Sequence, residues 1–147
     1  MPNTITPSVV EVRRTIRAPR QRVFDAWTKP EELKRWHAPG PMSVALAEMD
    51  LRVGGAYRIH MVAPTGEEHR VVGTYREVDP PRRLAYTWQW ETGSDATVST
   101  VTIDFVEHGG DTEVVLKHDG LSRDEARASH LQGWTAIVDK LDAHFAA

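Results

Sequence analysis

The sequence of 147 residues contains no cysteine. This absence excludes disulfide bonds, thiolate-bound metals, iron–sulfur clusters and a cysteine nucleophile. The sequence also lacks an apolar run near the roughly 18–20 residues that a membrane-spanning helix needs. No signal-peptide pattern follows Met1. We therefore expect a cytoplasmic protein without a membrane span.

Neither sign of charge is in large excess, because 18 Lys and Arg residues face 21 Asp and Glu residues, for a net charge of −3. A weakly acidic balance of this kind argues against nucleic acid or an anionic membrane as the main partner. A chain of roughly 150 residues can bury about 68–70% of its unfolded surface, which is enough for one core without covalent cross-links. Because no linker or repeat interrupts the sequence, we expect a single domain over residues 1–147.

The sequence signatures of several catalytic and cofactor sites are missing as well. The seven histidines form no His-Glu-x-x-His pair and no other close metal-ligand spacing. No Gly-x-Ser-x-Gly elbow, phosphate-binding loop or dinucleotide-binding glycine pattern occurs. We expect no metal ion and no cofactor.

What the sequence does contain is a clear order of hydrophobic periodicities. A β-branched, partly alternating stretch at residues 9–17 predicts a strand, with Val10, Val12 and Ile16 on one face. Pro19 and Pro30 then open two short amphipathic helices. From residue 43 the period changes to two, and Gly and Pro clusters separate six predicted strands: 44–51, 56–62, 68–78, 83–91, 99–107 and 112–118.

The last predicted element is a long helix. Ser122 and Glu125 have the spacing of a capping box, and a stripe of apolar and aromatic residues follows at helical spacing. About 24 residues make a helix of roughly 35 Å, long enough to cross a whole domain. A curled antiparallel sheet leaves its concave face open, and only this helix is long enough to cover it. We therefore predict an α+β helix-grip fold in the order β-α-α-β6-α.

Five segments of the sequence carry a resemblance to a known family. They are residues 17–28 (RAPRQRVFDAWT), 50–55 (DLRVGG), 73–81 (GTYREVDPP), 118–121 (HDGL) and 133–134 (GW). In this order, and together with Leu33 and Trp36, they resemble the SRPBCC (START/Bet v 1-like) superfamily, and within it the activator of heat-shock protein 90 ATPase homologue-like family. The resemblance implies a helix-grip fold with a cavity between the sheet and the C-terminal helix.

One position departs from the pattern of that family. Its members usually carry a second aromatic residue after the tryptophan that aligns with Trp36, whereas this sequence has His37. The substitution predicts a more polar and titratable cavity mouth.

Aromatic residues on the inward faces of the predicted strands form the strongest candidate site. Period two places Tyr86, Trp88 and Trp90 on one face, and it places Tyr57 and Met61 on another. Aromatic walls with a few polar tips suit an apolar or aromatic ligand. The alternative is that these rings fill the core and leave no cavity. The candidate ligand-binding residues are Trp36, His37, Tyr57, Ile59, Met61, Tyr86, Trp88, Trp90, His118, His130 and Trp134.

Three functions follow as hypotheses from the residues and from the resemblance. The first is a non-enzymatic protein that binds an apolar, aromatic or lipid-like small molecule. The second is a cyclase- or hydrolase-type enzyme that uses the same cavity, with His118, His130 and Tyr86 as acid–base candidates. The third is a chaperone-interacting protein that stimulates the ATPase of heat-shock protein 90, although authentic activators are similar to this chain in only one of their two domains. A homodimer is an open alternative, because many members of the family form dimers.

Overall fold

A computed structural model describes residues 3–5, 8–91 and 97–146. In these residues, eight antiparallel strands form one open sheet in the order β1-β2-β8-β7-β6-β5-β4-β3. The strands are β1 (Thr4–Ile5), β2 (Val10–Ile16), β3 (Ser43–Met49), β4 (Ala56–Val62), β5 (Glu68–Asp79), β6 (Arg83–Trp90), β7 (Ser99–His108) and β8 (Asp111–Asp119).

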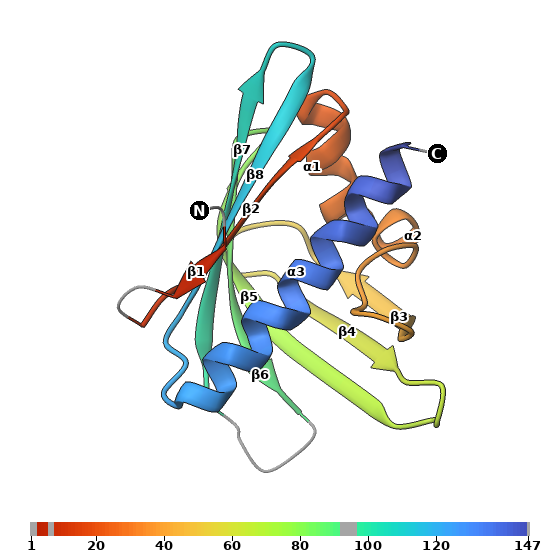
Figure 1. Cartoon of the computed structure of the whole chain (residues 1–147), viewed down its shortest axis with the longest axis vertical. Coiled ribbons are helices and arrows are strands. Elements are labelled where there is room, and N and C mark those ends of the chain that lie inside the picture. The colour runs from red at the N-terminus through yellow and green to blue at the C-terminus, as the bar shows by residue number, and fades with distance from the viewer. Residues whose placement is uncertain (1–2, 6–7, 92–96, 147) are drawn as a thin grey trace.

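Within the described ranges, three helices accompany the sheet: α1 (Arg20–Thr28), α2 (Pro30–Leu33) and α3 (Asp124–Ala146). Figure 1 shows α3 lying across one face of the curved sheet, while α1 and α2 lie beside the C-terminal end of α3. The α+β helix-grip fold predicted from the sequence is confirmed. Strand β1, which pairs with β2 through Thr4 and Glu11, is additional to the predicted elements. Two residues are too few to show a hydrophobic period.

The sheet curves where its ladders are irregular. The register shifts between Val44 and Leu46 in β3, and again between Tyr75 and Glu77 in β5. Such bulges bend a strand and increase its twist. Strands β3 to β5 lie away from α3 in Figure 1. The candidate site lies between α3 and strands β4 to β6.

Two sets of contacts hold α3 against the other half of the sheet. Val10, Val12 and Ile16 of β2 are fully buried, as their alternation predicts. In addition, the Arg14 guanidinium donates hydrogen bonds to Asp139 and, at 2.8 Å, to Asp142 of α3. These carboxylates raise the pKa of Arg14. The C-terminal half of α3 is thereby fixed to the sheet by apolar burial and by a paired charge.

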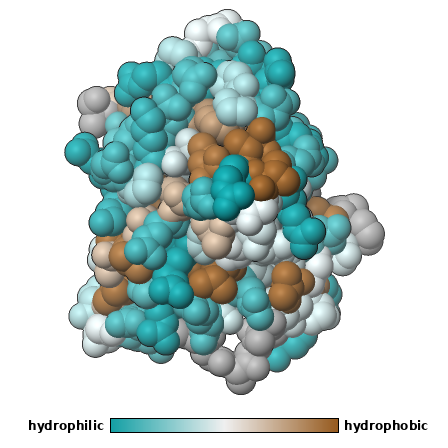
Figure 2. Space-filling view, turned by 180° about the vertical axis from the view of Figure 1, so that it is seen from behind, coloured by the Kyte–Doolittle hydropathy of each residue, from teal (hydrophilic) through white to brown (hydrophobic). Residues whose placement is uncertain are grey.

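The face of the sheet that points away from α3 has a different character. Figure 2 shows this side as mostly hydrophilic, with a few apolar areas among the charged residues. An open concavity on the surface mixes the apolar side chains of Val106 and Val115 with the charged groups of Arg13, Glu113 and Lys117. Among the described residues, no helix is long and apolar enough to span a membrane.

Candidate functional site

A pocket of about 190 Å³ lies between α3 and strands β4 to β6. Four buried side chains form its floor: Met61, Trp88, Trp134 and Ile137. Its rim is formed by more exposed residues, namely Pro39, Met42, His69, Trp90, Ser129, His130 and Gly133. None of these described lining residues is a carboxylate, a lysine or an arginine.

Strand and helix periodicities bring the lining residues together. Met61 of β4 faces its direct cross-strand partner His69 of β5, so both reach the same face of the sheet. Successive turns of α3 contribute the helical side of the pocket. The segment that carries Met42 is fastened to α3, because Lys140 donates its Nζ hydrogen bond to the Met42 carbonyl oxygen at 3.1 Å.

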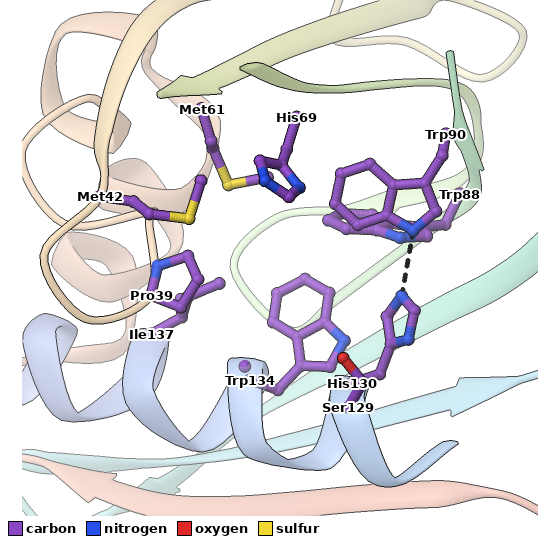
Figure 3. Close-up of a pocket in the computed structure, with 11 residues that line it drawn as sticks. Pro39, Met42, Met61, His69, Trp88, Trp90, Ser129, His130, Trp134 and Ile137 are labelled. Atoms are coloured by element: carbon purple, nitrogen blue, oxygen red, sulfur yellow. Dashed lines mark hydrogen bonds between the residues drawn. The ribbon is translucent and has the colours of Figure 1, made fainter. Parts of the chain in front are cut away.

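Tryptophan rings line one side of the pocket (Figure 3). The ring centroids of Trp88 and Trp134 lie 4.9 Å apart, and those of Trp88 and Trp90 lie 5.4 Å apart in an edge-to-face arrangement. Trp90 donates its indole N–H to Nε2 of His130 at 3.2 Å. Nδ1 of His130 lies 2.7 Å from the Ala126 carbonyl, so this nitrogen carries the proton. These two hydrogen bonds fix the side chains of Trp90 and His130 at the rim.

His118 lies behind this wall and is a fully engaged core residue. Its Nδ1 accepts the indole N–H of Trp134 at 2.9 Å, and its Nε2 lies 2.6 Å from Oγ of Ser99. The Ser99 hydroxyl donates to the Trp88 carbonyl, so Nε2 of His118 carries the proton and donates to Ser99. Burial, with a smaller contribution from His130, lowers the pKa of His118 well below its usual range. His118 is thus neutral, and both its nitrogens are occupied.

A second, much smaller space lies deeper in the core. It measures about 10 Å³, close to the volume of a single water site. Tyr57, Tyr75 and Tyr86 line it, and their ring centroids lie 5.1 to 6.0 Å apart. Burial raises the pKa of Tyr86, whose hydroxyl accepts the indole N–H of Trp27 at 3.4 Å. We call this space the tyrosine-lined void.

His37 separates the pocket from the tyrosine-lined void. Its ring lies 6.3 Å from that of Trp88 and 5.6 Å from that of Trp134, and the residue also lines the void. His37 is completely buried, and neither ring nitrogen has a hydrogen-bond partner in the described part of the chain. Burial lowers the pKa of His37 from 6.5 to about 4. The expected polar, titratable mouth is therefore instead a buried, neutral partition.

The structure divides the eleven sequence-predicted ligand-binding residues into three groups. The pocket itself is lined by Met61, Trp88, Trp90, His130 and Trp134. The tyrosine-lined void is lined by His37, Tyr57, Ile59 and Tyr86. Trp36 and His118 line neither space and are buried behind the walls.

Six lining residues were absent from the prediction: Pro39, Met42, His69, Ser129, Gly133 and Ile137. His69 could have been found from its place opposite Met61 across a hairpin, and Gly133 and Ile137 from helical spacing around Trp134. Pro39 and Met42 belong to an irregular segment, which has no period to reveal the direction of a side chain.

The acid–base candidates of the enzymatic hypothesis come together only in part, because His118 and His130 are neighbours with ring centroids 4.9 Å apart while Tyr86 lies elsewhere. Tyr86 lies in the tyrosine-lined void, His118 is occupied behind the wall, and His130 is at the rim. Within the described residues, no group of three or more histidine, aspartate or glutamate side chains has the geometry to hold a metal ion.

Comparison with known proteins decides the family. Residues 17–146 match the family described as activator of Hsp90 ATPase homolog 1-like protein. The chain belongs to this family. Its membership supports a ligand-binding or chaperone-associated fold.

Curated relatives share only part of their length with the chain. It is 26% identical over 111 residues to the mouse protein named activator of 90 kDa heat shock protein ATPase homolog 1, and 25% identical over 109 residues to the human protein of that name. Each match covers 73% of this chain but only 30% of the relative. The chain therefore spans less than a third of the curated relatives that it matches.

Solved structures match over almost their whole length. A protein from Chromobacterium violaceum superimposes with a TM-score of 0.88 at 26% identity, covering 95% of this chain and 98% of that one. The AHSA1 protein from Silicibacter pomeroyi superimposes with a TM-score of 0.82 at 27% identity, covering 94% and 97%. A protein from Arthrobacter aurescens, at 18% identity and a TM-score of 0.86, is similar in fold.

Proposed function

We propose that this member of the family binds a small aromatic or otherwise apolar molecule in the pocket between α3 and strands β4 to β6. One observation carries the proposal: the pocket is open, and it is walled by Trp88, Trp90 and Trp134 without a charged side chain among its described lining residues. Aromatic walls with few polar groups favour apolar ligands through burial and through ring contacts.

The volume of the pocket limits the size of the ligand. An engineered apolar cavity of roughly 150 Å³ is large enough to bind benzene, whereas pockets for drug-sized ligands measure about 300–1,000 Å³. At about 190 Å³ this pocket suits one ring with short substituents. A long lipid chain fits only if the pocket enlarges.

Polar side chains at the rim orient such a ligand in the pocket. Ser129 is exposed at the helical edge of the pocket, and His69 lies at the opposite edge with its Nε2 3.1 Å from a Glu67 oxygen. A polar substituent on the ligand is therefore accommodated at the mouth, while the ring packs against the tryptophans.

Gly133 offers a direct test, because it lines the pocket and a Cβ added there meets nothing within 4 Å. We expect Gly133→Leu to fill the pocket without disturbing the core, and to improve helix propensity by roughly 0.5–1 kcal/mol. Gly133→Ala is the matched control, since it makes the same backbone change and adds one methyl group.

The measurement is a tryptophan-fluorescence titration with single-ring aromatic compounds, supported by native mass spectrometry. We expect saturable binding to the wild type and to Gly133→Ala, and a loss of at least tenfold in affinity for Gly133→Leu. If the wild type binds none of the compounds, or if Gly133→Leu binds them as well as Gly133→Ala does, the proposal is wrong.

A second candidate, stimulation of a chaperone ATPase, is favoured by the similarity to the mouse and human activators. Because the match covers only 30% of those proteins, the activity of the whole relatives is a separate proposal. An ATPase assay of heat-shock protein 90 with and without this chain tests it. Unchanged turnover at saturating chain concentration would contradict this candidate and leave ligand binding unaffected.

A further inference from the structure

The five tryptophans of the chain differ in how their indole nitrogens are satisfied. Trp27, Trp90 and Trp134 each donate the N–H to a side chain, at 2.9 to 3.4 Å. Trp36 and Trp88 are just as deeply placed as Trp134, yet their Nε1 atoms have no partner in the described part of the chain. Buried donors are almost always paired in native proteins, so each exception calls for a physical explanation.

Both unpaired tryptophans lie against His37. The ring centroid of His37 is 5.4 Å from that of Trp36 and 6.3 Å from that of Trp88. Because both nitrogens of His37 also lack partners within the described residues, four unpaired nitrogens gather in three neighbouring rings. We call Trp36, His37 and Trp88 the unpaired cluster.

One member of the unpaired cluster, Trp88, lines the pocket, whereas Trp36 lines neither space. Trp88 forms part of the pocket floor, and His37 lines the tyrosine-lined void behind it. No hydrogen bond within the described residues holds any of these three side chains in place. Trp90 at the rim and Trp134 in the floor differ from Trp88, since each donates its indole N–H to a histidine.

The donors and acceptors of the unpaired cluster define which ligand groups could form hydrogen bonds with it. An indole N–H only donates, and a neutral imidazole donates through one nitrogen and accepts through the other. A carbonyl or hydroxyl oxygen fits this set, whereas a hydrocarbon does not. A ligand oxygen that pairs with these nitrogens removes the desolvation cost of leaving buried donors unpaired. This gain in free energy favours a small displacement of the indole and imidazole rings that admits the oxygen.

The charge of the surroundings decides between neutral and ionised ligands. The described linings of the pocket and of the tyrosine-lined void contain no carboxylate, lysine or arginine. His37 is neutral above pH 4 or so, because burial lowers its pKa to about 4. An ionised group between Trp88 and His37 would therefore be buried without a counter-charge, which is strongly unfavourable.

We propose that the ligand of this pocket carries a neutral carbonyl or hydroxyl group on its ring, and that this group inserts between Trp88 and His37. The inference rests on the proposed function, since it names the chemistry of the molecule that the pocket binds. The ring of the ligand occupies the pocket, and its oxygen accepts a hydrogen bond from the Trp88 indole and pairs with the His37 imidazole.

The test uses three probes of similar size: acetophenone, α-methylstyrene and benzoate. The first two have nearly the same shape, and they differ in having a carbonyl oxygen or a methylene group at one position. We measure the ratio of their dissociation constants, so that variants are compared with the wild type through the same pair of molecules. Benzoate reports whether a charged group is tolerated, and we expect it to bind at least tenfold more weakly than acetophenone.

Two variants remove the proposed partners and keep an aromatic ring at each position. In Trp88→Phe and in His37→Phe, we expect the preference for acetophenone over α-methylstyrene to fall by about five- to tenfold, the factor associated with one buried hydrogen bond. His108→Phe is the control, because His108 is exposed at the end of β7 and lies outside both spaces. Its preference should match that of the wild type.

A measurement on the wild type remains available if either variant fails to fold. The indole N–H resonance of Trp88 should move downfield on addition of acetophenone and not on addition of α-methylstyrene. An unchanged ratio in both folded variants, or an indole resonance that responds equally to both probes, would overturn this inference while ligand binding stands. If neither probe binds the wild type at all, both the proposed function and this inference fail.

Discussion

The ring of Tyr57 in β4 lies over Gly73, its direct cross-strand partner in β5. A Cβ on Gly73 would stand 2.5 Å from Cε2 of that ring and 2.0 Å from the carbonyl oxygen of Thr87 in β6. The Tyr57 hydroxyl donates to the same carbonyl at 2.5 Å. The absence of a side chain at Gly73 thus lets one tyrosine lie across three strands beside the tyrosine-lined void.

We predict that Gly73→Ala is strongly destabilising, because the added methyl group meets a backbone atom that cannot move aside alone. The expected loss is about 3 kcal/mol or more in the free energy of unfolding, measured by urea denaturation. Gly110→Ala is the matched control, since a Cβ at Gly110 meets nothing within 4 Å. A similar stability for the two variants would show that the Tyr57 ring is not fixed over Gly73.

The hydrogen bonds of His118 lead to a second prediction. His118→Phe keeps an aromatic ring but leaves the indole N–H of Trp134 without its acceptor and removes the donor to Ser99. Unpaired buried groups cost roughly 1–3 kcal/mol each, so we expect a loss of about 2–4 kcal/mol. Denaturant titration of this variant beside His108→Phe measures it. A loss no larger than that of the exposed control would mean that the hydrogen bonds of His118 to Trp134 and Ser99 contribute little to stability.

A third prediction concerns pH. The pKa of His37 is about 4 in the folded protein and 6.5 in its ordinary state. The unfolded chain therefore binds more protons than the folded one between these values, and stability present above pH 6.5 is lost as the pH falls toward 4. His37 alone accounts for about 2 kcal/mol between pH 7 and pH 5. The lowered pKa of His118 acts in the same direction.

The variant His37→Phe separates this contribution from that of His118. It removes the titrating group and two unpaired nitrogens, so we expect equal or higher stability at pH 7 and a flatter dependence on pH. The free energy of unfolding at pH 7 and at pH 5, for the variant and the wild type, gives the comparison. Identical slopes would contradict a buried, neutral His37.

Most of the strands could be predicted because their alternation is a local property of the chain. Alternation predicts a strand over residues 56–62, and β4 has the same bounds. The buried faces of β2 and β4 also follow the predicted period. The glycine and proline clusters between strands locate the turns for the same local reason. The helix-grip arrangement follows because one long amphipathic helix must cover one curled sheet.

The lining of the pocket could be predicted only in part. Periodicity indicates that Trp88 and Trp134 point inward, but it cannot tell which inward side chains meet each other and which border an open space. His118 and His130 illustrate the limit, since both lie on predicted inward positions. One is enclosed by Trp134 and Ser99, and the other reaches the rim beside Trp90.

By itself the sequence determined the order of the elements other than β1, their buried faces and the resemblance to the family, because these depend on residue types at short spacing along the chain. Only the tertiary structure decided that His37 is buried without a partner, and that the rings leave a pocket of about 190 Å³ on one side of it. The physical reason is that packing and hydrogen-bond pairing depend on how bulges and helix placement set the distance between sheet and helix. No local pattern encodes that distance.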